Sequence, residues 1–334
     1  RPFLPAADLL SYLEAILRVY NQLGRRDNIY KARIKILVEQ VGVEAFAEMV
    51  EAEWRNIRHG ELHLPAEELA RIAAYFAPPA YEKLPDHCLA LEAARAADPG
   101  FASWLDSNVE AHKQPGYAVV TISLKPHGGI PGDATAEQME AVADLAAHYS
   151  FGEIRVTYKQ NLVLADVRKA DLHELWLGLR LDDLATANAG LVSDIIACPG
   201  LDYCNLANAR SIPIAQEIGR RFRDIEREHG IGPVTVNVSG CINACAHHHM
   251  ANIGILGVDK KGSEAYQITL GGRATEDAAI GAIIGPAVAG DQVADAVETI
   301  VDVYLAGRRS GEAFIDTYRR TGPEPFKEKL YATA

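Results

Sequence analysis

The stretches CPGLDYC at residues 198–204 and GCINAC at residues 240–245 hold four of the five cysteines of this chain. The first pair is spaced C-x5-C and the second C-x3-C, and the second follows VTVNV at residues 234–238, a run typical of a β-strand. Four thiolates from two short loops can surround one inorganic centre. The expected ligands are Cys198, Cys204, Cys241 and Cys245.

The spacing of the two pairs bears on the kind of centre. Structural zinc sites usually take each pair of thiolates from a tight C-x2-4-C loop, and the C-x5-C loop is wider than that. Iron-sulfur clusters are larger, are held by four cysteine thiolates and accept more varied spacing. Disulfides are a third possibility, although cytosolic cysteine clusters are more often metal sites or catalytic. Spacing alone therefore favours an iron-sulfur cluster over zinc, and zinc over structural thiols or disulfides.

Two motifs together resemble a known family. The C-x5-C pair with NVSGCINAC at residues 237–245 resembles the signature of the sulfite and nitrite reductase hemoproteins, which carry a 4Fe-4S cluster bridged to siroheme. Upstream, RVTYKQNLVL at residues 155–164 is similar to the R-x-T-x-x-Q-N segment of that family. The context HHH at residues 247–249 and IGILG at residues 253–257 is most similar to single-chain bacterial assimilatory sulfite reductases.

The resemblance implies roles for particular residues. The last cysteine, Cys245, would also ligate the siroheme iron, and Asn243 would hydrogen-bond a siroheme carboxylate or a cluster sulfur. Siroheme is a polyanion, so cationic side chains are expected around it. From the residues alone, the favoured interpretation of the cations at 25–37 is a solvated helix face, and that of Lys159-Gln160 is a polar hairpin turn. The positions assigned to siroheme by resemblance are Arg33, Lys35, Arg155, Thr157, Gln160, Asn161, Asn243 and Cys245.

The implied reaction is the six-electron reduction of sulfite to sulfide. The alternative within the family is a ferredoxin-dependent nitrite reductase that forms ammonia, and the alternative of another class is a zinc-stabilised binding module without redox chemistry. Ferredoxin or a flavoprotein would supply electrons. The substrate-binding cations of the family come mostly from a first half with no counterpart here, so we expect an N-terminally truncated piece that does not turn over substrate by itself. Three adjacent histidines in an extended segment point alternately, so they cannot all face one ion.

Composition limits the class of protein. The chain has 334 residues, which predicts two or three domains, and 49% hydrophobic with 23% charged residues is ordinary for a globular protein. A net charge of -12 argues against nucleic acid as a partner. No apolar run reaches the length of a membrane span and no signal peptide opens the chain, so we expect a cytoplasmic protein with no membrane partner.

Hydrophobic periodicity predicts an α+β fold in three parts. Residues 1–110 read as a helical segment that ends a preceding half and then forms a connector, broken by prolines. Residues 111–185 alternate strand, helix, two strands and helix, which suits a ferredoxin-like half-domain. Residues 186–334 form a mixed α/β domain for the 4Fe-4S cluster and siroheme. Its last expected helices are Asp291–Leu305 and Gly311–Thr321, followed by an exposed tail.

Overall fold

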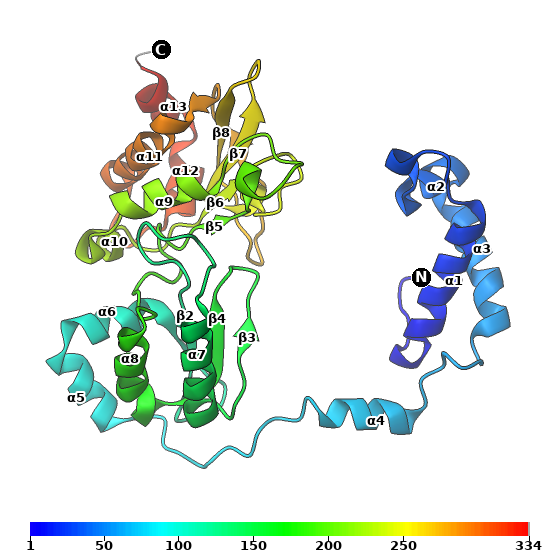
Figure 1. The fold of residues 1–334 in the computed structure, drawn as a ribbon, viewed down its shortest axis with the longest axis horizontal. Helices are drawn as coiled ribbons and strands as arrows, with labels where there is room; N and C mark the ends of the chain where they lie inside the picture. Colours follow the sequence, from blue (N-terminus) through cyan, green and yellow to red (C-terminus); the bar gives the residue numbers. More distant parts are fainter. Residues whose placement is uncertain (333–334) are drawn as a thin grey trace. The chain divides into compact units, whose positions relative to one another are not determined.

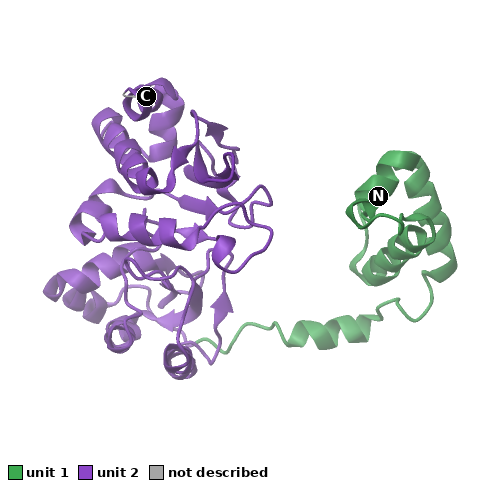
Figure 2. Ribbon diagram, turned by 45° about the horizontal axis from the view of Figure 1, so that its top comes forward, with its two compact units in different colours: residues 1–81 green, residues 82–334 purple. Residues whose placement is uncertain are grey.

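The computed structural model describes residues 1–332, which form two compact units (Figures 1 and 2). The first unit covers residues 1–81 and the second begins at Glu82. The first is entirely helical, whereas the second contains both sheets. Each unit is described by itself below.

The first unit is a helical hairpin with a small core. Helix α1 packs against α3, and the buried side chains of this core are Ala15, Val19, Val50 and Trp54. The Trp54 indole N–H donates to the Ser11 hydroxyl at 3.0 Å, which satisfies the polar edge of a ring that is only 1% exposed. The helices are α1 Leu9–Leu23, α2 Ile34–Val41, α3 Val43–Ile57 and α4 Ala66–Ala74.

The second unit begins with the ferredoxin-like half-domain. Its four strands are antiparallel in the order β1-β2-β4-β3, and Ala118, Val120 and Ile122 of β2 lie in the same core as the helices. The elements are α5 Leu89–Ala97, α6 Pro99–Asn108, β1 Val109–Ala111, β2 Tyr117–Ile122, α7 Ala136–Tyr149, β3 Arg155–Val156, β4 Leu162–Arg168 and α8 Leu172–Leu181. Helices α5 and α6 were grouped with the N-terminal segment from sequence, but Phe101 and Trp104 of α6 are buried in the half-domain core.

The rest of the second unit is a mixed sheet in the order β10-β8-β7-β6-β5, with β9 paired to β8. Strands β5, β6 and β7 are parallel, and β7 and β8 form the antiparallel hairpin expected around residues 259–262. The strands are β5 Ile196–Ala197, β6 Val236–Ser239, β7 Ile253–Asp259, β8 Glu264–Leu270, β9 Ala282–Ile283 and β10 Val288–Ala289. The helices are α9 Ile212–Arg221, α10 Ile225–Ile231, α11 Val293–Gly307, α12 Phe314–Thr321 and α13 Glu324–Tyr331.

The predicted α+β class is confirmed, and one detail is wrong. The segment after Thr321 was expected to be an exposed tail, but it forms α13, whose Phe326 is 1% exposed. The Phe326 ring lies against Phe314 and Tyr318, with ring centroids 6.0 and 5.7 Å apart. Phe326 is surrounded in the sequence by charged residues, so the segment resembled a solvent-exposed tail. No helix within residues 1–332 combines the length and the apolar character needed to cross a bilayer.

Candidate metal centre

Both cysteine loops begin at the same edge of the second sheet. Strand β5 ends at Ala197 and β6 ends at Ser239, and in this parallel pair Ala197 lies opposite Val238. The Cys198 N–H continues the pairing by donating to the Val238 carbonyl at 3.1 Å. Because the carboxyl ends of parallel strands meet at one edge, the C-x5-C and C-x3-C loops emerge side by side. This is the arrangement that a shared centre requires.

Backbone hydrogen bonds join the two loops directly. The Gly240 carbonyl accepts from the N–H groups of Asn208 and Ala209 at 2.8 and 3.1 Å. The approach is so close that a Cβ atom on Gly240 would lie 2.6 Å from the Ala209 carbonyl oxygen and 2.9 Å from the Cα atom of Gly200. Gly200 itself has φ of +60°. Glycine is therefore required at position 240 because any side chain would push the two loops apart.

The sulfur atoms differ in their surroundings. The Cys198 Sγ accepts a hydrogen bond from the Gly240 N–H at 3.0 Å and lies 3.3 Å from the Ser211 hydroxyl. Hydrogen bonds to sulfur stabilise a thiolate and influence the potential of a cluster. Cys198 and Cys204 are half-buried, Cys241 is buried and Cys245 is exposed, and all four are free thiols. The exposed residue, Cys245, is the one to which the family resemblance assigns a second role, as a ligand of the siroheme iron.

The donor set fits a four-thiolate cluster in its chemistry. It consists of four free cysteines on two joined loops, and three of these residues are not fully buried. Within residues 1–332, no three or more histidine, cysteine, aspartate or glutamate side chains are arranged to hold a metal ion. The assignment of Cys198, Cys204, Cys241 and Cys245 as ligands thus stays a prediction from sequence, supported by the common origin of their loops.

The R-x-T-x-x-Q-N segment forms the turn between β3 and β4. Thr157 and Asn161 lock it, since the Asn161 carbonyl accepts from both the N–H and the hydroxyl of Thr157, each at 3.0 Å. The carboxamide of Gln160 bonds to the backbone of Ala197, directly before the first cysteine. Arg155 is exposed and pairs with Glu153 at 2.5 Å. The polar hairpin turn, which was the alternative to a siroheme contact, is present in the structure. The Gln160 side chain of this turn bonds to the residue directly before the first cysteine.

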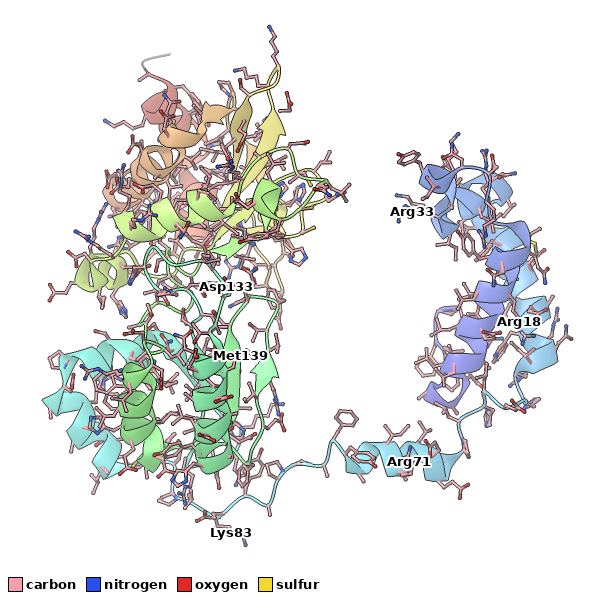
Figure 3. All side chains as sticks on the ribbon, viewed as in Figure 1. Arg18, Arg33, Arg71, Lys83, Asp133 and Met139 are labelled. Carbon is pink, nitrogen blue, oxygen red and sulfur yellow. The ribbon has the colours of Figure 1, made fainter. Side chains whose placement is uncertain are left out.

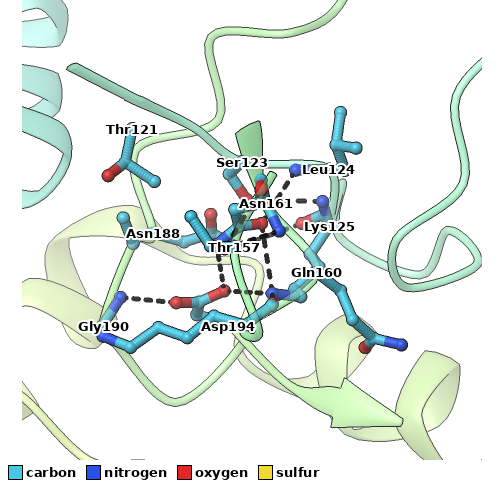
Figure 4. A network of polar contacts seen from close by, with 12 residues as sticks. Thr121, Ser123, Leu124, Lys125, Thr157, Gln160, Asn161, Asn188, Gly190 and Asp194 are labelled. Atoms are coloured by element: carbon cyan, nitrogen blue, oxygen red, sulfur yellow. Dashed lines mark hydrogen bonds and ion pairs between the residues drawn. The ribbon is translucent and has the colours of Figure 1, made fainter. Parts of the chain in front are cut away.

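A buried ion pair adjoins this turn through Asn161 (Figure 4). It was not among the features predicted from the sequence. The Lys125 ammonium, 2% exposed, lies 2.6 Å from the Asp194 carboxylate and 3.1 Å from the Asn161 side-chain oxygen. The Asn161 amide donates to the same carboxylate at 2.9 Å. Burial lowers the pKa of Lys125, and the Asp194 charge opposes that shift. Lys125 lies far along the chain from Asp194, so no local pattern could have predicted the pair.

A second buried carboxylate joins the same region. Glu228 of α10 is fully buried and accepts from the Ser193 N–H at 2.6 Å and from the His127 ring at 3.2 Å. His127 follows β2, whereas Glu228 belongs to the cysteine-bearing domain. Together with the Lys125–Asp194 pair, this contact fixes the half-domain against the sheet that carries the cysteine loops.

The C-x3-C loop continues into the three histidines. Asn243 is exposed, and Ala244 and His247 take left-handed backbone conformations with φ of +55° and +53°. His248 is buried and stacks on His249 with ring centroids 3.9 Å apart, and burial lowers the pKa of His248 to about 4. His247 and His249 are exposed. The extended segment expected for the three histidines is wrong, because His248–Met250 form a short 3-10 helix after the left-handed His247.

A cavity of about 250 Å³ lies beside this loop, with Asn237, His247, Lys159, Arg273 and Phe314 in its wall. The Arg273 guanidinium pairs with the Asp277 carboxylate, 2.9 Å away. Besides Arg155, two cations were assigned to siroheme, Arg33 and Lys35. Both lie in the first unit and are exposed, and Figure 3 labels Arg33 at the start of α2. Their approach to a tetrapyrrole stays a prediction.

Known proteins share both the motifs and the fold. A family model described as the nitrite and sulphite reductase 4Fe-4S domain matches residues 1–57 and 189–333, and the nitrite/sulfite reductase ferredoxin-like half domain matches residues 111–181. Sulfite reductase [ferredoxin] 2 of Mycolicibacterium paratuberculosis is 27% identical over 93% of this chain and 51% of its own length. Ferredoxin–nitrite reductase of Synechococcus elongatus is 29% identical over 89% of this chain and 51% of its own. The structure of Mycobacterium tuberculosis NirA is 26% identical, with a TM-score of 0.65 over 97% of this chain and 54% of that one.

Proposed function

We propose that this chain, which belongs to the nitrite and sulphite reductase family, is the cluster-binding half of an enzyme that reduces sulfite to sulfide. The chain spans about half the length of the curated relatives it matches. The observation that carries the proposal is the pair of cysteine loops joined at one edge of the parallel strands β5 and β6.

Siroheme and a 4Fe-4S cluster are the cofactors of this family, and together they supply electron transfer to a tetrapyrrole iron that binds an oxyanion. In this chain the four cysteines would hold the cluster, and the exposed Cys245 would also reach the siroheme iron. Gly240 and Ser211 would hydrogen-bond the first ligand, and burial would exclude water from Cys241. The residues proposed near siroheme are Arg33, Lys35, Arg155, Thr157, Gln160, Asn161 and Asn243.

The proposed substrate is sulfite, supported by the HHH and IGILG context after Cys245. Nitrite is the second candidate, because relatives named for sulfite and for nitrite match with similar identity. Both relatives are named for ferredoxin, which supports ferredoxin rather than a flavoprotein as the electron donor. The cytoplasmic location stays a prediction from sequence.

The test of the proposed centre is a cysteine series on the chain purified without oxygen. We expect bound iron and sulfide with strong visible absorption, which Cys198→Ser removes. Cys245→Ser should lower siroheme retention as well. The matched control is Cys88→Ser, because Cys88 is half-buried at the start of α5 and belongs to neither pair. A colourless protein with stoichiometric zinc would contradict the proposal. Assays of the whole enzyme with sulfite and with nitrite then separate the two substrates.

A further inference from the structure

The strand that delivers the first cysteine is held weakly by its own sheet. Strand β5 consists of Ile196 and Ala197 alone, and it lies at the end of the sheet with β6 as its neighbour on one side. Successive residues of a strand turn their N–H and C=O groups to opposite sides. Because the Cys198 N–H faces β6, the N–H and C=O of Ala197 face the open edge. An edge of this kind is prone to local opening.

The carboxamide of Gln160 closes that edge. Its Nε2 donates to the Ala197 carbonyl at 2.8 Å, and its Oε1 accepts from the Ala197 N–H at 3.0 Å. This reciprocal pair of hydrogen bonds is what a neighbouring strand would provide, but it comes from one side chain of the half-domain. Both polar ends of the carboxamide are thereby occupied. The residue next to this contact is the first cysteine of the C-x5-C pair.

The turn that carries Gln160 is itself rigid. Gln160 has φ of +59°, a conformation uncommon outside glycine, and its N–H donates to the Thr157 carbonyl at 3.1 Å. The following Asn161 is fixed by the buried Lys125–Asp194 pair, whereas the Gln160 side chain extends away from that pair (Figure 4). Gly132 packs so closely that a Cβ there would lie 3.0 Å from the Gln160 Cβ. Gly132 thus lies against one side of the Gln160 side chain, and the carboxamide at its end bonds to β5.

We infer that Gln160 is a positioning residue for the first cluster ligand. By holding Ala197, it keeps the Cys198 sulfur against the Gly240 N–H and the Ser211 hydroxyl. Loss of the two carboxamide bonds would let β5 open and weaken those contacts to sulfur. The inference rests on the proposed function only in that Cys198 is a cluster ligand. The hydrogen bonds themselves belong to the chain whether or not a cluster is bound.

The first experiment compares Gln160→Met with Gln138→Met by hydrogen exchange. Methionine keeps the length of glutamine and removes both hydrogen bonds. Gln138 is a matched control, since its side chain also accepts from a backbone N–H, that of Thr135 at 3.0 Å, and donates to a carbonyl, that of Asp182 at 2.8 Å. It lies on α7 of the same half-domain and touches no part of β5. Peptides over residues 196–204 should exchange about tenfold faster in Gln160→Met only.

The second experiment uses the cluster-loaded protein and a charge variant. Iron release to a chelator should be about tenfold faster in Gln160→Met than in wild type or Gln138→Met. Gln160→Glu keeps an acceptor for the Ala197 N–H but sets a second oxygen against the Ala197 carbonyl. Its exchange, corrected for intrinsic rates, should be fast at pH 8 and slower at about pH 4, near the ordinary pKa of a glutamate carboxyl, where the protonated form can donate.

The outcomes separate this inference from the proposed function. Unchanged exchange over residues 196–204 in Gln160→Met overturns the inference, as does equal acceleration in Gln138→Met. Faster exchange without a change in iron release also overturns it, because the strand would then open without affecting the ligand. If wild-type protein assembles no cluster, the proposed function fails, while the exchange comparison still decides whether Gln160 holds β5.

Discussion

The helices of the first unit and the last helices of the second unit follow the same plan. Each region starts with a three-residue 3-10 turn, at Ala6–Asp8 and Gly290–Gln292, followed by a 15-residue helix, α1 or α11. An 8-residue helix follows, either α12 directly after α11 or α2 after a further 3-10 turn at Ile29–Lys31. A glycine with positive φ separates this helix from α3 or α13. The same 4Fe-4S domain model matches both regions of the chain.

The two regions differ in what covers their first helix. When Leu9 is paired with Val293 and the comparison continues residue by residue, the apolar positions of α1 and α11 agree over the first twelve pairs except at Ala15 and Thr299, and they diverge from Asn21 and Leu305 onward. In α11 the residues Val293, Val297 and Val301 are 0% exposed in the core with β6, β7 and β8. Their counterparts in α1, Leu9, Leu13 and Leu17, are 47%, 46% and 54% exposed. Residues 1–81, all described, contain no strand that could cover them.

The difference teaches what an amphipathic pattern determines. The period of apolar residues fixes which face of a helix is suited to burial, but not whether the covering element belongs to the same unit. We define the apolar stripe of α1 as Leu9, Leu13 and Leu17. This stripe is suited to packing against a sheet, but the first unit contains no sheet.

The largest expected effect comes from a charge placed at the equivalent position of each helix. Val297→Asp buries an unpaired carboxylate in the core of the second unit and should cost more than about 4 kcal/mol, enough to abolish its cooperative unfolding. Leu13→Asp should change stability by less than about 0.5 kcal/mol, because the side chain is half-exposed. Urea titrations followed by circular dichroism measure both. A large loss with Leu13→Asp would show that the stripe of α1 is covered in solution.

The next effect concerns the aromatic anchor of each third helix. Trp54 of α3 packs edge-on against Tyr12 with ring centroids 5.4 Å apart, and Phe326 of α13 packs on Phe314. Either change to alanine should cost about 3–5 kcal/mol. The small core of the first unit should not survive Trp54→Ala, whereas the second unit should tolerate Phe326→Ala with a lower Tm. Calorimetry resolves the two transitions; a shift of the second-unit transition in Trp54→Ala would contradict an effect confined to the core of the first unit.

Local sequence patterns predicted the elements whose structure depends on residues close together in the sequence. The strand before Cys241 is a β-branched run, and the cysteine spacings reflect loops that leave adjacent strands, so both could be predicted. Phe101 and Trp104 could not be assigned to the half-domain, because nearby prolines suggested a connector and their packing partners lie farther along the chain. A proline-broken stretch gives no information on which core its aromatic residues enter.

The candidate site divides in the same way. The four cysteines could be proposed as ligands from the sequence because residue type and spacing are features of a ligand set that the sequence itself contains. The role of Gln160 could not, since its partner is the backbone of Ala197, and a backbone group leaves no mark in the sequence. The Lys125–Asp194 pair was hidden for a related reason: two opposite charges far apart in sequence are compatible with surface positions until the fold is known.

The smallest expected effect concerns the glycine that separates α2 from α3 in the first unit and α12 from α13 in the second. Gly42 has φ and ψ of 87° and 152°, and Gly322 has 76° and 180°, a region that is essentially restricted to glycine. Alanine at either position should cost about 1–3 kcal/mol of the stability of its own unit. A Cβ on Gly42 meets nothing within 4 Å, so Gly42→Ala isolates backbone strain, whereas a Cβ on Gly322 would lie 3.0 Å from the movable Glu324 carboxylate.

The control for that pair is Gly230→Ala within α10, where the added Cβ also meets nothing within 4 Å and no positive φ is required. It should be neutral or stabilising by up to about 1 kcal/mol, because alanine favours the helix. Thermal unfolding of the three variants orders them. Equal stability of Gly42→Ala and wild type would mean that the link between α2 and α3 relaxes without cost, which would end the correspondence with α12 and α13 at its most specific residue.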